Sequence, residues 1–167
     1  MKEIFDRRSI RKFQSRPVEK EKIDRILRAG MQAPSAGNQQ PWEFIVAEDR
    51  KTLYELSKMS PYSGSVAGSA VTLVLLGNFT GLKFPAAWQQ DMGAAAENIL
   101  LEAVHLGLGA VWVGAGNTES SIAFLRNMFH LPEQIHPFSL IAIGYPDGQQ
   151  NEFVDRYRGE KVHYEKY

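Results

Sequence analysis

The sequence predicts an α+β protein in which helices flank a central mixed β-sheet. Four segments have strand patterns, residues 42–47, 70–76, 109–114 and 138–145, and helical patterns lie between them. The strands and helices do not alternate in the regular order of a parallel α/β sheet. A chain of 167 residues with 44% hydrophobic residues can bury a sizeable core, so we expect one domain spanning residues 1–167.

Three helices and one strand are predicted before residue 60. Residues 2–6 have the pattern of a short amphipathic helix. Pro17 and the glutamate that follows it suit a second helix start, and apolar residues then recur at helical spacing: Ile23, Ile26, Leu27 and Met31. Strand 42–47 alternates, with three apolar residues on one face: Trp42, Phe44 and Val46. Asp49 can cap a third helix.

The rest of the chain contains the strongest strand patterns. Residues 70–76 are almost wholly apolar, which is typical of a strand buried on both faces. A long helix is predicted over 86–106, and its many small residues indicate that it runs through a core or a subunit interface. Residues 118–129 have an amphipathic helical pattern between the last two strands. The tail, residues 146–167, is polar, charged and aromatic, without a core pattern.

Composition excludes several classes of site. Lys plus Arg and Asp plus Glu both total 19, which argues against a general nucleic-acid binder. The chain has no cysteine, so disulfides, thiolate catalysis and Cys-based metal sites are excluded, and its four histidines lack metal-ligand spacing. No apolar run approaches the ~20 residues of a membrane span. We therefore expect a cytoplasmic enzyme or binding protein without a metal, a membrane or a nucleic-acid partner.

A dense basic segment lies at residues 7–13, RRSIRKF. Arginine presents a rigid fork of donors that matches phosphate oxygens, and Ser9 adds a hydroxyl donor. One interpretation is an anion site sized for a single phosphate. The alternative is a solvated basic face, with Glu3 and Asp6 as partial partners.

No motif for a protein-based reaction is present. The glycines at 107, 109, 114 and 116 do not match the dinucleotide spacing, and turn or close-packing roles suit them better. Asp91 and Glu97 lie six residues apart on the long helix, on different faces, so they do not form an acid/base pair. If the protein is an enzyme, a bound cofactor should carry the difficult step.

Four segments together point to a known family. They are residues 7–13, residues 33–42 (APSAGNQQPW), the long helix with the strand that follows it to residue 114, and the tail motif at residues 156–164. In this order, they resemble the nitroreductase family of FMN-dependent oxidoreductases over essentially the whole chain. The resemblance implies an intertwined homodimer in which the tail, about residues 146–167, embraces the partner subunit.

The resemblance also implies a set of FMN-binding residues. Arg7, Arg8 and Ser9 would face the phosphate or ribityl groups, and Arg11 would approach flavin N1/O2. The loop of the partner subunit would line the isoalloxazine ring through Pro34, Ser35, Ala36, Gly37 and Asn38. Gly114 would sit near the reactive edge of the flavin, and Lys161 would bind the phosphate, with Arg158 as an alternative. No side chain would be catalytic, because flavin N5 carries the hydride.

The implied activity is a ping-pong reduction of a small-molecule acceptor by NAD(P)H. Nitroaromatics, quinones and related conjugated electrophiles are the implied acceptors. The alternatives are reductive dehalogenation, azoline oxidation, flavin fragmentation or non-catalytic flavin binding, and a nucleic-acid module is disfavoured by the zero net charge. The segment 78–87, which often forms a lid in the family, is short here, so the pocket is expected to be open or to be completed by a ligand.

Overall fold

A four-stranded sheet in the order β1-β2-β4-β3 forms the middle layer of the protein. In the computed structural model, which describes residues 1–167, β1 (Trp42–Ala47), β2 (Val71–Asn78), β3 (Gly109–Gly114) and β4 (Ile135–Gly144) pair antiparallel throughout. The α+β class is confirmed, but the expectation of a mixed sheet is corrected, because all three strand pairings are antiparallel. The only parallel pairing is an isolated bridge between Ser9 and Ala110, which places the basic segment along the outer edge of β3.

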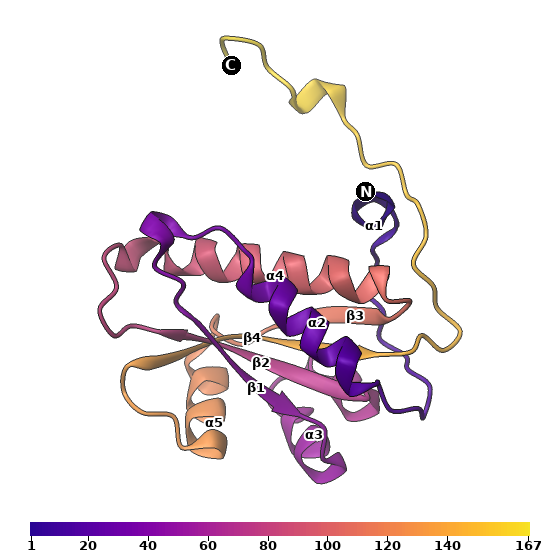
Figure 1. The fold of residues 1–167 in the computed structure, drawn as a ribbon, viewed down its shortest axis with the longest axis vertical. Coiled ribbons are helices and arrows are strands. Elements are labelled where there is room, and N and C mark those ends of the chain that lie inside the picture. The colour runs from indigo at the N-terminus through magenta and orange to yellow at the C-terminus, as the bar shows by residue number, and fades with distance from the viewer.

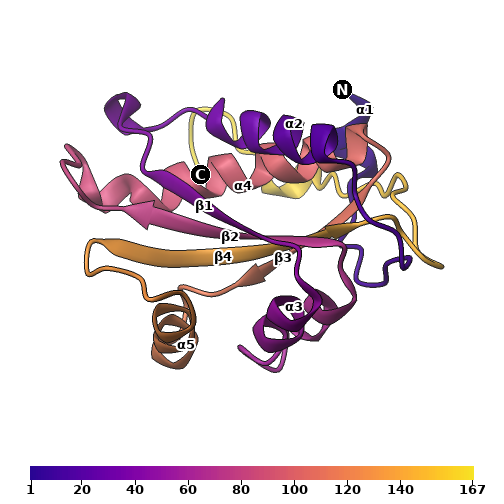
Figure 2. The same cartoon turned by 60° about the horizontal axis from the view of Figure 1, so that its bottom comes forward.

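Helices cover both faces of the sheet. Helices α2 (Lys20–Met31) and α4 (Trp88–His105) lie on one face, and α3 (Arg50–Leu56) and α5 (Glu119–Phe129) lie on the other (Figures 1 and 2). Each face has its own apolar cluster. Because β2 contacts both clusters, every residue of this strand except the last is buried, as its apolar sequence predicts.

Helix α4 contacts all four strands as well as α1 and α2. Three of its seven buried residues are alanines, and the full set is Asp91, Met92, Ala95, Ala96, Ile99, Leu100 and Ala103. Helix α2 packs tightly against it at Gly30, where a Cβ would lie 2.9 Å from the side chain of Ile99. The small residues of the sequence therefore set the short distance between these two helices.

Several predicted boundaries shift by a few residues. Helix α2 begins at Lys20 rather than next to Pro17, and Asp49 caps α3 as predicted by accepting a hydrogen bond from Thr52 N at 2.9 Å. Strand β4 begins at Ile135, three residues before the predicted start, although Pro137 lies within it. The pairing with β2 shifts register at Leu75/Leu76, next to this proline, so its missing N–H interrupts the ladder where the ladder is already irregular.

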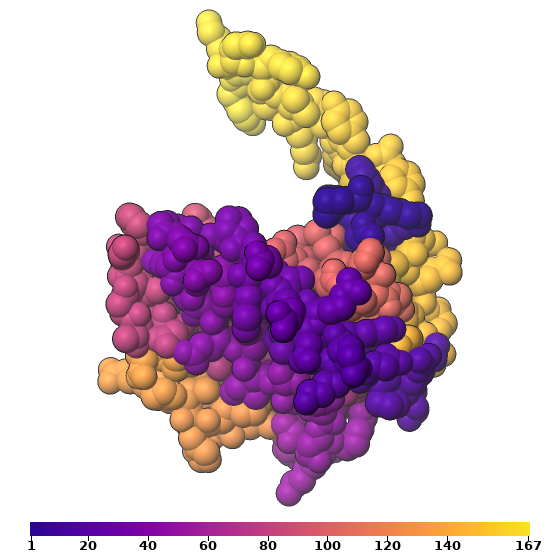
Figure 3. Space-filling view, viewed as in Figure 1, coloured from indigo at the N-terminus to yellow at the C-terminus, as the bar shows by residue number.

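The N-terminus of the chain lies near the C-terminal end of α4 (Figure 1). The short helix α1 (Lys2–Asp6) is held there by an ion pair between Glu3 and His105, with Nδ1 and Oε1 2.9 Å apart. After β4 the tail runs away from the body of the molecule (Figures 1 and 3), and residues 152–167 are all exposed. None of the helices is long and apolar enough to cross a membrane.

A polar cluster joins the start of α2 to the end of β4. The hydroxyl of Tyr145 donates to Glu19 Oε2 at 2.6 Å and accepts from Lys22 Nζ at 2.8 Å. The guanidinium of Arg16 stacks 3.8 Å from the centre of the Tyr145 ring. The hydrogen bond from Tyr145, above all, lowers the pKa of the Glu19 carboxyl from its ordinary 4.5 to about 2.

This cluster predicts an acid-dependent loss of stability. Because folding lowers the pKa of Glu19, its contribution is complete above pH 4.5 and is lost as the pH falls toward about 2. Tyr145→Phe should therefore be less stable than the wild type near neutral pH, and the difference should shrink through this window. Urea unfolding at several pH values measures it, with the exposed Tyr54→Phe as control. A difference that stays constant with pH would contradict the prediction.

Candidate functional site

The basic segment is anchored to the sheet by one buried residue. Ile10 is 1% exposed and packs directly on Gly109, where a Cβ would lie 2.6 Å from the Cβ of Ile10. The backbone N–H of Ile10 also donates to Ala110 O at 3.0 Å. Because the backbone on both sides of Ile10 is fixed in this way, Ser9 and Arg11 emerge at defined points on the edge of β3.

The cations of this segment have few carboxylate partners. Arg7 Nε lies 3.4 Å from Glu97 Oε1, and Arg8 donates to backbone carbonyls, including Phe5 O at 3.2 Å. Arg8 Nε is buried without a hydrogen-bond partner. The acidic neighbours are engaged elsewhere: Glu3 pairs with His105 and Asp6 with Lys2. The segment is therefore not a basic face neutralised by its own helix.

Two side-chain amides of the tail hold the backbone of the basic segment. Gln149 Oε1 accepts from the N–H groups of Arg11 and Lys12 at 2.7 and 3.0 Å. Asn151 Oδ1 accepts from Arg8 N at 3.1 Å, and its Nδ2 donates to Leu108 O at 2.9 Å. Sequence reasoning missed both residues, because two amides in a polar tail carry no motif.

A cavity of about 460 Å³ lies beside β3 and contains two of the residues singled out from the sequence. Arg11 and Gly114 line it, together with the turn after α3, which includes Tyr62, and the first residues of α5. At Gly114 a Cβ would lie 2.8 Å from Asn117 Nδ2, so a larger residue there would crowd Asn117 in the cavity wall.

The loop of residues 34–38 lies near the N-terminal end of α4 and is organised by Asp91. This carboxylate is 4% exposed, and it accepts from Ala36 N at 2.8 Å and from Gln39 Nε2 at 2.6 Å. Gly37 and Asn38 both have positive φ, 55° and 54°. The Pro-Ser-Ala-Gly-Asn sequence thus forms a tight turn, and Asp91 is a structural anchor for it rather than an acid or base.

Within one chain, the loop, the basic segment and the predicted tail residues lie apart from one another. Asp91 holds the loop and Glu97 contacts Arg7, and a spacing of six residues places these two carboxylates about 120° apart around α4. The loop and the basic segment therefore lie on different flanks of the helix (Figure 1). Arg158 and Lys161 lie in the exposed tail, where they line a recess formed by tail residues alone.

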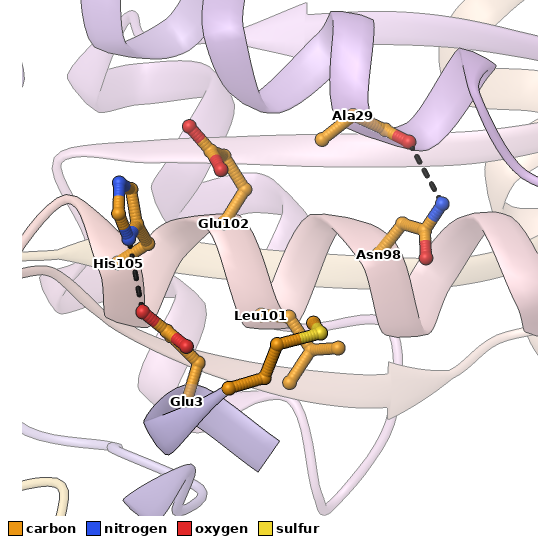
Figure 4. Close-up of a pocket in the computed structure, with 7 residues that line it drawn as sticks. Glu3, Ala29, Asn98, Leu101, Glu102 and His105 are labelled. Carbon is orange, nitrogen blue, oxygen red and sulfur yellow. Dashed lines mark hydrogen bonds and ion pairs between the residues drawn. The ribbon is translucent and has the colours of Figure 1, made fainter.

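A second cavity, of about 380 Å³, lies between α1, α2 and α4 and contains none of these residues. Figure 4 shows Asn98 donating to Ala29 O at 3.0 Å on one side and His105 pairing with Glu3 on the other. The hydrogen bond from His105 lowers the pKa of Glu3. These contacts fix α1 against α4, and α1 leads directly into the basic segment.

The basic segment, the loop and the long helix occur in the same order in a known family. Residues 4–61 and 60–145 match the model of the Nitroreductase family. The chain belongs to the nitroreductase family. A provisionally named NADH dehydrogenase/NAD(P)H nitroreductase of Archaeoglobus fulgidus is 39% identical over 170 residues, which cover 100% of this chain and 98% of that relative.

Solved structures agree with this assignment to the nitroreductase family. The crystal structure of a provisionally named NADH oxidase of Clostridium acetobutylicum has a TM-score of 0.97 and 52% identity, covering 99% of both chains. An FMN-dependent nitroreductase of Clostridium difficile R20291 has a TM-score of 0.92 and 30% identity, covering 100% of both chains. The resemblance of the sequence to nitroreductases is thereby confirmed.

The contact between Ile10 and Gly109 predicts the effect of a single methyl group. Gly109→Ala should push Ile10 from its pocket and destabilise the protein by about 1–3 kcal/mol, the usual range for overpacking. Trypsin should then cleave faster after Arg8 and Arg11, because the segment detaches from β3. Gly64→Ala is the control, since its Cβ meets nothing within 4 Å. Equal cleavage rates in the two variants would show that Ile10 does not anchor the segment.

Proposed function

We propose that two copies of this chain bind FMN in two shared sites and use it to pass electrons from NAD(P)H to a small conjugated acceptor. Membership of the nitroreductase family supports the proposal, and relatives named as an NAD(P)H nitroreductase and an FMN-dependent nitroreductase support the donor and the cofactor. A cytoplasmic location and a single domain over residues 1–167 stay predictions.

The basic segment fits the phosphate of FMN, and this observation carries the proposal. Arg7, Arg8, Arg11 and Lys12 have one carboxylate contact between them, the Arg7–Glu97 pair. Leaving a buried donor unpaired costs about 1–3 kcal/mol, and Arg8 Nε is such a donor. A phosphate oxygen would offset that cost through a charge-assisted hydrogen bond. No dinucleotide loop is present for the larger FAD.

The separation of the two halves of the site supports a homodimer. Helix α4 has 18 residues and is about 27 Å long, so two copies that cross in opposite directions bring the loop of one to the basic segment of the other. Gly93 leaves open space on the outer flank of α4. The tail exposes Phe153, Tyr157 and Tyr164, large apolar surfaces that a partner subunit would cover.

Each singled-out residue then has a role. Arg7, Arg8 and Ser9 hold the phosphate or ribityl groups, with Lys161 or Arg158 of the tail as a further phosphate ligand. Arg11 places positive charge at the pyrimidine edge of the ring. Gly114 leaves room at the reactive edge, and the partner's loop lines the ring face through a backbone made compact by three residues in particular: Ala36, Gly37 and Asn38.

Bound FMN would supply two-electron transfer at N5, for which no side chain of the site is a substitute. The chain itself binds and orients the reactants and shields them from water. Because the donor and the acceptor use the same face in turn, the kinetics should be ping-pong. Nitroaromatics, quinones and related conjugated electrophiles are the proposed acceptors.

The first test is the identity and reactivity of the cofactor. The purified protein should contain about one noncovalent flavin per subunit, released by acid as FMN rather than FAD. NADH or NADPH should bleach its yellow colour in the absence of oxygen. Chromatography of the released chromophore and anaerobic spectra measure the two outcomes. A protein that takes up no FMN on reconstitution, or binds FAD instead, would overturn the proposal.

The second test is complementation between subunits. Arg7→Ala/Arg11→Ala removes one half of the site, and Gly37→Val removes the other, since its Cβ would lie 2.5 Å from the Phe84 ring at a φ of 55°. Each variant alone should be inactive. Random exchange of subunits in an equimolar mixture makes half of the dimers mixed, and each mixed dimer has one intact site out of two. About a quarter of the wild-type activity should therefore return.

Native mass spectrometry of the mixture is the control for this complementation, because it shows whether mixed dimers form. Mixed dimers without recovered activity would contradict the shared site. A fully active monomer would do the same.

A further inference from the structure

The side chain of Gln39 connects two segments that lie far apart in sequence. Its Nε2 donates to Asp91 Oδ2 at 2.6 Å and to Phe84 O at 3.1 Å, and its Oε1 accepts from Phe84 N at 3.0 Å. The amide therefore satisfies both backbone groups of Phe84 while it is held by a buried carboxylate. This arrangement joins the loop of residues 34–38 to the short segment 78–87.

The backbone contacts place the ring of Phe84 directly over the loop. A Cβ at Gly37 would lie 2.5 Å from Phe84 Cε2, so only glycine leaves room for the ring. Phe84 nevertheless remains 51% exposed. A large aromatic side chain is thus held in place on one side and left uncovered on the other.

We propose that Phe84 forms an aromatic wall of the acceptor pocket and that Gln39 is the positioning residue that holds it. The proposal rests on the proposed function, which places this loop beside the flavin of the partner subunit. The segment 78–87 is then neither absent from the pocket nor in need of a ligand to order it. Two hydrogen bonds join Gln39 to the backbone of Phe84 in this segment, and a third joins Gln39 to Asp91.

The physical basis is preorganised stacking. Aromatic rings in offset or edge-to-face contact gain about 0.5–1.5 kcal/mol beyond the burial of their area. A loosely placed ring would lose part of this stacking free energy, because ordering the side chain when the acceptor binds costs conformational entropy. A ring that packs over Gly37, on a backbone that Gln39 holds, gives its full contribution to a flat acceptor and little to a compact, non-planar one.

Steady-state kinetics with two acceptors test the proposal. In a ping-pong reaction, kcat/KM for the acceptor is independent of the donor, so it isolates the acceptor half-reaction. With nitrobenzene, Phe84→Ala should raise KM and lower kcat/KM about two- to ten-fold, whereas ferricyanide should show less than about a two-fold change. Phe84→Tyr should restore the wild-type values. Tyr54→Ala is the control for loss of an exposed aromatic residue.

Variants of Gln39 test the positioning role. Gln39→Leu should show the same selective loss for nitrobenzene, and amide hydrogen exchange at Phe84 should quicken about three-fold or more because its acceptor is gone. The exposed Gln32→Leu is the matched control. Thermal unfolding and FMN content identify any variant that fails to fold.

The outcomes separate this proposal from the proposed function. Wild-type protein whose flavin is not reduced by NAD(P)H would overturn both. Normal flavin reduction, together with equal losses for nitrobenzene and ferricyanide in Phe84→Ala, would overturn the acceptor wall alone. Faster exchange at Phe84 in Gln39→Leu, with unchanged nitrobenzene kinetics, would overturn the positioning role.

Discussion

The packing of α4 on the sheet is the constraint on which the other features of this protein depend. Its buried residues, Met92, Ala95, Ile99 and Ala103 among them, leave no freedom to rotate or slide. One flank presents Asp91 to the loop, and another presents Glu97 to the basic segment. The same helix therefore positions the loop and the basic segment and separates them within one chain. The proposed homodimer would bring the loop of one copy to the basic segment of the other.

Three glycines let a side chain approach the backbone closely, at the sheet edge, between α2 and α4, and over the loop. Gly109 admits Ile10 to the edge of the sheet, Gly30 admits Ile99 between two helices, and Gly37 admits the Phe84 ring over the loop. In each case a Cβ would meet a side chain at 2.9 Å or less. The stability gained from these contacts holds in place a basic segment whose charges are poorly paired within the chain.

The tail combines a fixed beginning with a free end. Gln149 and Asn151 bind the backbone of the basic segment, so the start of the tail forms part of the candidate site. Beyond residue 151 every side chain is exposed, although the segment is rich in aromatic residues. A single chain leaves these aromatic side chains in water. The proposed homodimer would cover them.

Local sequence patterns predicted most of the helices and strands and singled out the basic segment. The apolar run of β2, the small residues of α4 and the Asp49 cap are local patterns, and each predicted its element within a few residues. The contacts between distant segments become evident only in the folded chain. Gln39 and Phe84 are 45 residues apart, and Gln149 lies 138 residues from Arg11. Such contacts depend on the three-dimensional course of the backbone, which no local pattern of residues encodes.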